Sequence, residues 1–211
     1  MSRPQTDIEA GREKLVETAE QIIRERGAIT FTIADLAAEA GMSQSNVYRF
    51  FASKDALAEE MAGRWFADKT AIMEKLVEED IPVREKLYAF FARRLAVMQQ
   101  RFDENPELFA AYMELGDLHF EVIRGYVDLA DHYMAIILAE AMEEGYFRGL
   151  ELDMVVSLVN MMVQPFCNPR VMMMLNRAAD EEKLRLIIDA IFDGLHAPSG
   201  QTGETELHLA G

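Results

Sequence analysis

Six polar side chains lie close together on a segment near the N-terminus whose apolar spacing is helical. They are Ser43, Gln44, Ser45, Asn46, Tyr48 and Arg49. Proteins use hydroxyl, amide and guanidinium groups of this kind to contact the phosphates and base edges of duplex DNA. The amide of Gln44, for example, is suited to pair with adenine through two hydrogen bonds. The segment therefore predicts a surface that contacts nucleic acid.

The residues around this segment have the spacing of a helix-turn-helix unit. Thr32 is expected to cap a first short helix, and Ser43 is expected to cap a second one that ends near Phe51. Gly41 lies between the two helices, where the turn needs a residue that tolerates positive φ. Ala37 supplies the small side chain that a close helix crossing needs. The apolar positions of the unit are filled by Leu36, Ala40, Met42, Val47 and Phe50.

Two other interpretations of this unit remain open from the sequence. An αα-hairpin with an incidentally polar surface also places a glycine between two short helices. The prediction of DNA recognition therefore depends on the joint pattern of small, apolar and polar positions. A rival function of another class is a helical protein-interaction module whose N-terminal unit binds a protein. Salt-dependent binding to a palindromic DNA would separate the two functions.

The stretch from Gly41 to Leu57, GMSQSNVYRFFASKDAL, resembles the signature of the tetracycline-repressor (TetR) family of bacterial transcriptional regulators. In that family an aromatic pair follows the recognition helix, and a Ser/Asn-Lys step opens a long fourth helix. The resemblance runs from the first helix to about Leu57. It implies an all-α fold and a homodimer. It also implies a C-terminal domain that senses a small-molecule effector and controls affinity for a double-stranded DNA operator, most simply as a repressor.

The resemblance also implies roles for single residues. Tyr48 and Lys54 match residues that contact phosphates. Thr32 matches a residue that caps a helix and contacts a phosphate of the DNA backbone. Gln44 matches a residue that reaches base edges. Ala34 departs from the pattern, because some members carry a base-reading arginine there. The residues predicted to bind DNA are Thr32, Ser43, Gln44, Ser45, Asn46, Tyr48, Arg49 and Lys54.

Helical periodicity dominates the whole chain, and we find no convincing alternating strand. We predict a helix-turn-helix domain over residues 1–53 and a helical ligand-binding and dimerisation domain over 54–196. Residues 197–211 are rich in Gly, Ser, Thr and Pro and predict a disordered tail. The predicted helices run over about 7–26, 33–40, 43–51, 54–79, 82–102, 105–117, 118–144, 152–164 and 180–195.

The family resemblance implies a ligand pocket among the helices of the larger domain, and the aromatic and methionine residues there are candidates to line it, because both adapt to varied apolar shapes. The candidates are Trp65, Phe91, Tyr112, Met113, His119 and Asn160. Plain core packing is the alternative. Glu114, Asp117 and Glu121 flank the aromatics. One of them, if buried, would favour a cationic apolar ligand, whereas a solvated acidic face is the alternative.

Apolar stripes on the last helix and the helix before it predict a dimer interface, and an intrachain core is the alternative. The residues are Val156, Val159, Val163, Leu184, Ile187, Ile188, Ile191 and Phe192. A dimer is needed if two recognition helices are to reach major grooves about 34–36 Å apart.

No sequence feature supports an enzyme. The four histidines are scattered, the single cysteine, Cys167, has no histidine nearby in sequence, and no P-loop, dinucleotide or zinc-hydrolase motif occurs. We expect neither metal nor cofactor. Without a signal peptide or a membrane-spanning stretch, the chain is expected to be cytoplasmic.

The formal net charge of −16 over 211 residues argues against nucleic acid if it is taken as a single figure. The charge is unevenly distributed, however. Residues 1–57 hold seven Lys or Arg and nine Asp or Glu, a net charge of −2, which leaves −14 for the rest of the chain. The acidic part is therefore expected to face solvent, while the nearly neutral N-terminal part meets DNA.

Overall fold

A computed structural model describes residues 5–26, 31–175 and 178–197 of the chain. Within these residues the protein has eleven helices and no strand, which confirms the predicted all-α fold. The helices are α1 (Gln5–Arg26), α2 (Ile33–Glu39), α3 (Gln44–Val47), α4 (Lys54–Val77), α5 (Val83–Glu104), α6 (Pro106–Leu118), α7 (Phe120–Glu143), α8 (Leu152–Met162), α9 (Gln164–Cys167), α10 (Pro169–Leu175) and α11 (Glu181–Gly194). Of the predicted tail, all but Ala197 lies outside the described residues.

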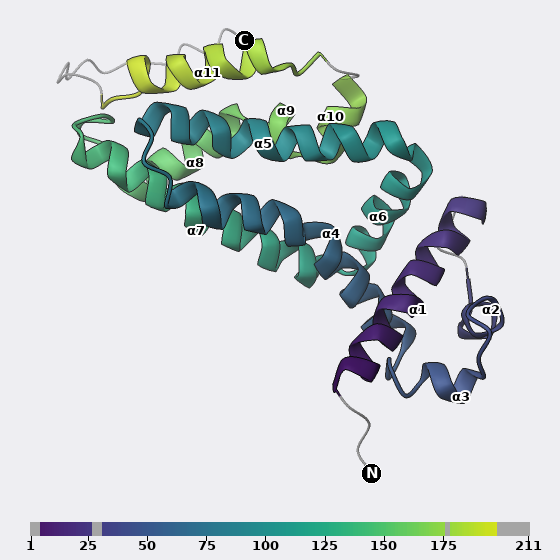
Figure 1. Ribbon diagram of the computed structural model, residues 1–211. Helices are drawn as coiled ribbons and strands as arrows, with labels where there is room; N and C mark the ends of the chain where they lie inside the picture. Colours follow the sequence, from purple (N-terminus) through teal and green to yellow (C-terminus); the bar gives the residue numbers. More distant parts are fainter. Residues whose placement is uncertain (1–4, 27–30, 176–177, 198–211) are drawn as a thin grey trace, which may run out of the picture.

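The first three helices form a small unit at one end of the molecule (Figure 1). Its core is built from α1, α2 and α3, and the side chains of Leu15, Ile22, Leu36, Val47 and Phe51 are all buried there. The apolar spacing within each short helix is what turns these side chains to one side. The unit is therefore held by its own core, and its polar positions are left for the surface.

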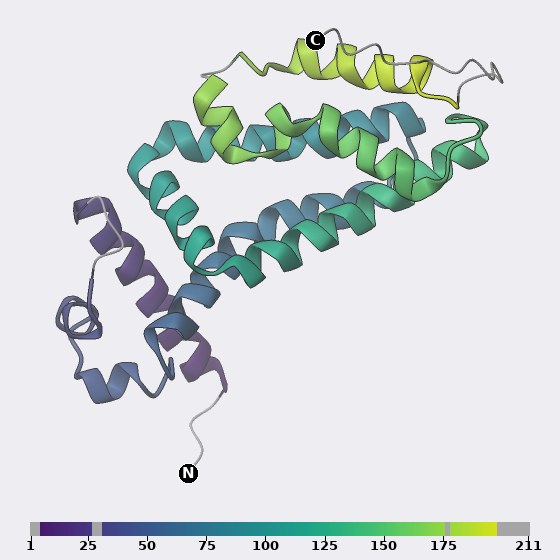
Figure 2. The same cartoon turned by 180° about the vertical axis from the view of Figure 1, so that it is seen from behind.

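The long helix α4 leaves this unit and enters the larger group of helices (Figure 1). There α4, α5 and α7 pack against one another, α11 lies along α5, and α8 packs against α7. Seen from behind, α8 to α10 pass in front of α5 (Figure 2). The centre of this group is apolar and includes the buried side chains of Leu87, Phe90, Phe91 and Met134.

Three helix boundaries have local causes. The helix predicted from Leu118 to Glu144 is α7, which begins at Phe120 because the backbone leaves the helical region at His119, where α6 ends. After α8, Pro165 lies in the first turn of α9, and Pro169 is the first residue of α10. Proline has no N–H to donate and is therefore accepted at the start of a helix but not in its interior.

No helix among the described residues is long and apolar enough to cross a membrane.

Candidate functional site

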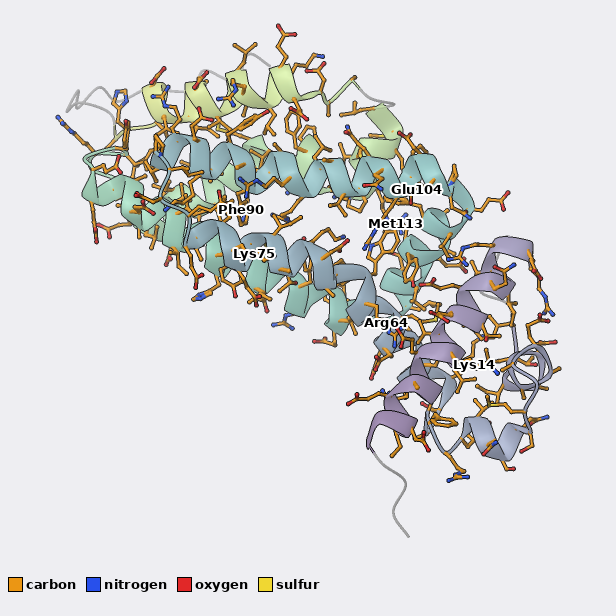
Figure 3. All side chains as sticks on the ribbon, in the orientation of Figure 1. Lys14, Arg64, Lys75, Phe90, Glu104 and Met113 are labelled. Carbon is orange, nitrogen blue, oxygen red and sulfur yellow. The ribbon has the colours of Figure 1, made fainter. Side chains whose placement is uncertain are left out.

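The turn between α2 and α3 is fixed by local hydrogen bonds. Gly41 has a φ of 67°, the left-handed conformation that the turn was expected to need. Lys14 of α1 donates a hydrogen bond from Nζ to the Ala40 carbonyl oxygen at 3.0 Å (Figure 3). The Ser43 hydroxyl accepts a hydrogen bond from the Asn46 backbone N–H at 3.3 Å, which caps α3 as predicted. The position of α3 is thus set by α1, the turn and its own cap.

The residues predicted to bind DNA all lie at the surface of this unit. Six of them are exposed and the other two, Asn46 and Lys54, are half-buried. Tyr48 is 51% exposed and is among the large apolar or aromatic residues that the fold leaves at the surface. Arg49 donates a hydrogen bond from Nη1 to Asn46 Oδ1 at 3.4 Å, so two of these side chains also contact each other. The structure therefore presents this polar set to solvent within one continuous segment.

Thr32 and Lys54 come together at the start of α2. Thr32 forms a capping box with Asp35, and the hydrogen bond from the Thr32 backbone N–H is the largest cause that lowers the pKa of the Asp35 carboxyl. Lys54, the first residue of α4, donates a hydrogen bond from Nζ to the Phe31 carbonyl oxygen at 2.7 Å. Its ammonium also lies 4.8 Å from the centre of the Phe31 ring. A positive charge is thereby held next to Thr32.

The larger domain encloses a cavity of about 550 Å³ lined by residues of α4 to α10. Five of the six residues predicted from the sequence line it: Trp65, Phe91, Tyr112, Met113 and Asn160. Figure 3 labels Met113 on α6 and a further lining residue, Phe90, on α5. His119 is not among the lining residues, because it lies at the break between α6 and α7.

Paired aromatic rings form much of the cavity wall. Trp65 of α4 and Tyr112 of α6 are stacked with ring centres 4.2 Å apart. Phe66 of α4 and Tyr126 of α7 are stacked at the same distance. Such rings bring a large apolar surface and few rotatable bonds. The cavity is therefore suited to an apolar molecule held between α4, α6 and α7.

The buried charges of this wall are positive. Lys69 of α4 and Arg94 of α5 line the cavity and are only 3% and 6% exposed. By contrast, none of Glu114, Asp117 and Glu121 is buried, so the acidic residues that flank the aromatics form a solvated face. Of the two alternatives left by the sequence, the structure agrees with the solvated acidic face, because a preference for cations required a buried carboxylate among these three.

The cavity reaches the boundary between the larger domain and the N-terminal unit through Tyr112. The Tyr112 hydroxyl donates a hydrogen bond to a carboxylate oxygen of Glu20 on α1. Burial, and then the Glu20 carboxylate, raise the pKa of Tyr112, so its hydroxyl keeps the proton it donates. Trp65 and Tyr112 line this cavity and also a smaller polar cavity of about 360 Å³, whose other residues include Glu20 and Arg101. These two rings therefore separate the apolar cavity from the domain boundary.

Most of the residues predicted at a dimer interface are already buried inside the chain. Val159, Val163, Leu184, Ile188, Ile191 and Phe192 are at most 5% exposed, and only Val156 and Ile187 are partly accessible. The reason is that the apolar stripe of α11 packs on α5 and that of α8 packs on α7. This corrects the residue assignment: the stripes serve the chain's own core, and the residues buried in them are not accessible to a partner chain.

Sequence reasoning missed Lys69 and Arg94, although a signal was present. The buried face of α4 carries Trp65, Lys69 and Met73 four residues apart, so the helical period places this lysine among core residues. Arg94 lies in the same way between Phe90 and Met98 on α5. A cation on an apolar stripe is therefore the pattern that would have found them. Among the described residues no cluster of His, Cys, Asp and Glu could hold a metal ion.

Comparison with known proteins finds a family model that matches each of the two parts of the chain. Residues 15–61 match the family model described as bacterial regulatory proteins, tetR family, and residues 83–188 match the tetracyclin repressor-like C-terminal domain. The transcriptional repressor KstR2 of Mycobacterium tuberculosis is 25% identical over 169 residues, which cover 74% of this chain and 78% of KstR2. The uncharacterized transcriptional regulator YvaF of Bacillus subtilis is 25% identical over 182 residues, 84% of this chain and 91% of YvaF.

A solved structure agrees with these matches. The TetR family regulator PfmR from Thermus thermophilus is 25% identical, with a TM-score of 0.57 over 88% of this chain and 97% of PfmR. The family matches and this structure agree with the exposed polar helix of the helix-turn-helix unit and with the larger helical domain that follows it. The chain is a DNA-binding transcriptional regulator and belongs to the tetR family of bacterial regulatory proteins.

Proposed function

We propose that this regulator binds a palindromic operator as a homodimer, represses transcription there, and is released by a small, largely apolar effector that enters the cavity of the larger domain. The repressor function named for KstR2 supports the direction of regulation. The observation that carries the effector response is the hydrogen bond from Tyr112, a cavity-lining residue, to Glu20 of α1. Through it, a molecule in the cavity acts on the helix that holds the DNA-binding unit.

The exposed polar segment supports the DNA contacts. In this proposal Gln44 and Ser45 meet base edges from the N-terminal end of α3, and Tyr48 and Lys54 meet phosphates. Thr32, Ser43, Asn46 and Arg49 complete the surface. Phosphate contacts fix the orientation of the protein on the duplex, and base contacts select the sequence.

The release step is a shift between two arrangements of the N-terminal unit. An effector that wedges between Trp65 and Tyr112 displaces the Tyr112 ring, because the two rings are stacked across the cavity wall. The Tyr112 hydroxyl then loses Glu20, and α1 turns relative to α4 and α6. The two recognition helices of a dimer no longer match the spacing of two major grooves.

Tyr112→Phe tests this coupling. The variant keeps the ring and removes only the hydroxyl, so we expect it to fold and to bind the operator about twofold to tenfold more weakly, the effect of one hydrogen bond. Fluorescence anisotropy on duplexes selected by the wild-type protein from a random-sequence pool measures the affinity. Tyr133→Phe is the matched control, because Tyr133 also donates to a carboxylate, that of Glu74, but within the larger domain.

Two results would count against the proposal in different ways. Equal operator affinities for Tyr112→Phe and Tyr133→Phe would show that the Tyr112 hydroxyl does not couple the cavity to the DNA-binding unit. A wild-type protein that enriches no duplex from the pool would contradict operator binding itself.

A further inference from the structure

Three charged side chains are buried among the described residues, and they differ in how their charge is balanced. They are Lys69, Lys86 and Arg94. Lys86 donates from Nζ to both carboxylate oxygens of Glu140, at 3.0 and 2.8 Å. Within the part of the chain that the structure describes, neither Lys69 nor Arg94 has a carboxylate within ion-pair distance. The two cations without a carboxylate are also the two that line the cavity.

The surroundings of these two cations are aromatic. The Lys69 ammonium lies 4.6 Å from the ring centre of Phe66 and 5.3 Å from that of Tyr126. Arg94 donates a hydrogen bond from Nε to the Tyr126 hydroxyl at 3.1 Å, and its guanidinium lies 4.8 Å from the centre of the Phe90 ring. Ring faces attract cations, but they do not neutralise a buried charge as a carboxylate does.

The carboxylates near the cavity are committed to other groups. Asp117 pairs with Arg170, and both side chains are more than half exposed. Asp131 accepts a hydrogen bond from the Asn160 amide at 2.9 Å. Asp68, next to Lys69 in sequence, pairs with Arg101 at 2.6 Å and is exposed. Asp68 and Asp117 are thus paired with other cations, and Asp131, although it lines the cavity, is not within ion-pair distance of Lys69 or Arg94.

A buried cation without an anion is costly, and an anion from outside the chain removes that cost. We propose that the effector is an amphipathic anion, whose carboxylate binds to Lys69 and Arg94 and whose apolar body lies against Trp65, Phe91 and Met98. This inference rests on the proposed function, because it names the chemical class of the molecule that enters the same cavity. The charge of this anion is opposite to that of the cationic apolar ligand that was one of the two alternatives from the sequence.

The proposal has a second consequence, a proton taken up on binding. Burial and then the charges of Arg101 and Arg94 lower the pKa of Lys69 to about 7, and Asp68 opposes this shift. Asp131, Arg170 and Asp117 are the other charged lining residues, and of these Arg170 and Asp117 form an ion pair with each other. A carboxylate next to Lys69 raises this pKa again. Near pH 7 the Lys69 amine therefore takes up protons when a carboxylate binds, whereas at pH 5, below this pKa, it is protonated with or without the ligand.

Matched probes test the class of ligand. Decanoate, 1-decanol and decylammonium share a flexible apolar chain and differ in the charge of the head. The pair of 2-naphthoate and 2-naphthalenemethanol repeats the comparison on a rigid aromatic body. Trp65 is the single tryptophan of the chain and lines the cavity, so its fluorescence reports binding of the decyl probes, and calorimetry measures all five. We expect at least one carboxylate to bind about tenfold or more tightly than its alcohol, and decylammonium to bind most weakly.

Variants at position 69 separate the charge from the shape of the side chain. Lys69→Met keeps an unbranched chain without the charge, and we expect it to lose the preference for the carboxylate and the proton uptake. Lys69→Arg keeps a charge that does not titrate, so it should keep the preference and lose the proton uptake. Lys75→Met is the matched control, because Lys75 lies on the same helix and is exposed (Figure 3). Calorimetry in two buffers of different ionisation enthalpy, at pH 7 and pH 5, counts the protons.

Each outcome decides one of the two proposals. If the alcohols bind as tightly as the carboxylates, or if Lys69→Met and Arg94→Met both keep the preference, the effector is not an anion, while the cavity remains a ligand site. If none of the five probes binds, the anion proposal fails. The effector response as a whole fails only if Tyr112→Phe also behaves like Tyr133→Phe on DNA. Thermal unfolding of each variant confirms that the comparison is made between folded proteins.

Discussion

Single side chains on the N-terminal unit divide between those that hold the fold and those that are left exposed. Lys14 and Ser43 contact backbone atoms of the turn and of α3, and so position the helix. Gln44 and Tyr48 are exposed, and their polar groups are the ones that duplex DNA can use. We therefore expect a substitution at either exposed residue to change DNA binding with little effect on stability.

Tyr48→Phe and Gln44→Ala are expected to weaken DNA binding in different ways. Removing the Tyr48 hydroxyl loses a phosphate contact, so affinity should fall about twofold to tenfold for every duplex alike. Removing the Gln44 amide should alter the preference at one base pair by about 1–3 kcal/mol and leave other positions unchanged. Binding to a set of single-base variants of the selected duplex measures both effects. A uniform loss for Gln44→Ala would contradict its assignment to a base.

At the scale of the elements, two glycines in open space show what the turn requires. A Cβ added at Gly41 or at Gly63 would meet no atom within 4 Å, so neither substitution causes a clash. They differ only in the backbone, because Gly41 has a φ of 67° and Gly63 lies inside α4. Side-chain packing therefore cannot explain any difference between the effects of alanine substitutions at these two glycines on stability.

Alanine at these two positions should change the free energy of unfolding with opposite signs. Gly41→Ala forces an alanine into the left-handed region and should destabilise the protein by about 1 kcal/mol. Gly63→Ala removes a flexible residue from a helix and should stabilise it by up to about 1 kcal/mol. Urea unfolding measures both values. A stabilising effect at Gly41 would show that the turn does not hold the left-handed conformation in solution.

On the scale of the whole molecule, the faces of α8 and α11 that are not used by the core remain apolar in places. Met154 and Met161 of α8 are 52% and 72% exposed, and Leu186 of α11 is 63% exposed. These side chains lie outside the buried stripes of their helices. We place the partner chain on these exposed apolar side chains of α8 and α11.

Met161→Arg should shift the proposed dimer toward the monomer, because it places a charge in an apolar interface without touching the core of the chain. Sedimentation at micromolar concentration measures the distribution. Ile136→Arg is the control, since Ile136 is an exposed apolar residue on α7, which is outside the proposed interface. A wild-type monomer at this concentration, or equal dissociation by both variants, would contradict the placement of the interface.

The sequence by itself determined the all-α class, the turn at Gly41, the caps at Thr32 and Ser43, and the polar set on α3. These features depend on neighbours within a few residues, so local spacing is enough to predict them. It also placed Trp65, Tyr112 and Asn160 near a cavity, but only through the family resemblance.

The tertiary structure decided which apolar stripe meets which, and what charge the cavity wall carries. The stripe of α11 is buried by α5, a helix far away in the sequence, so its apolar spacing could not tell an intrachain core from a dimer interface. Lys69 and Arg94 come from two helices and are brought to one wall only by their packing, while Glu114, Asp117 and Glu121 turn to solvent. A sum of charges along the chain averages over surfaces that the fold separates, and for that reason the net charge of −16 predicted neither the DNA-binding surface nor a cavity whose buried charges are positive.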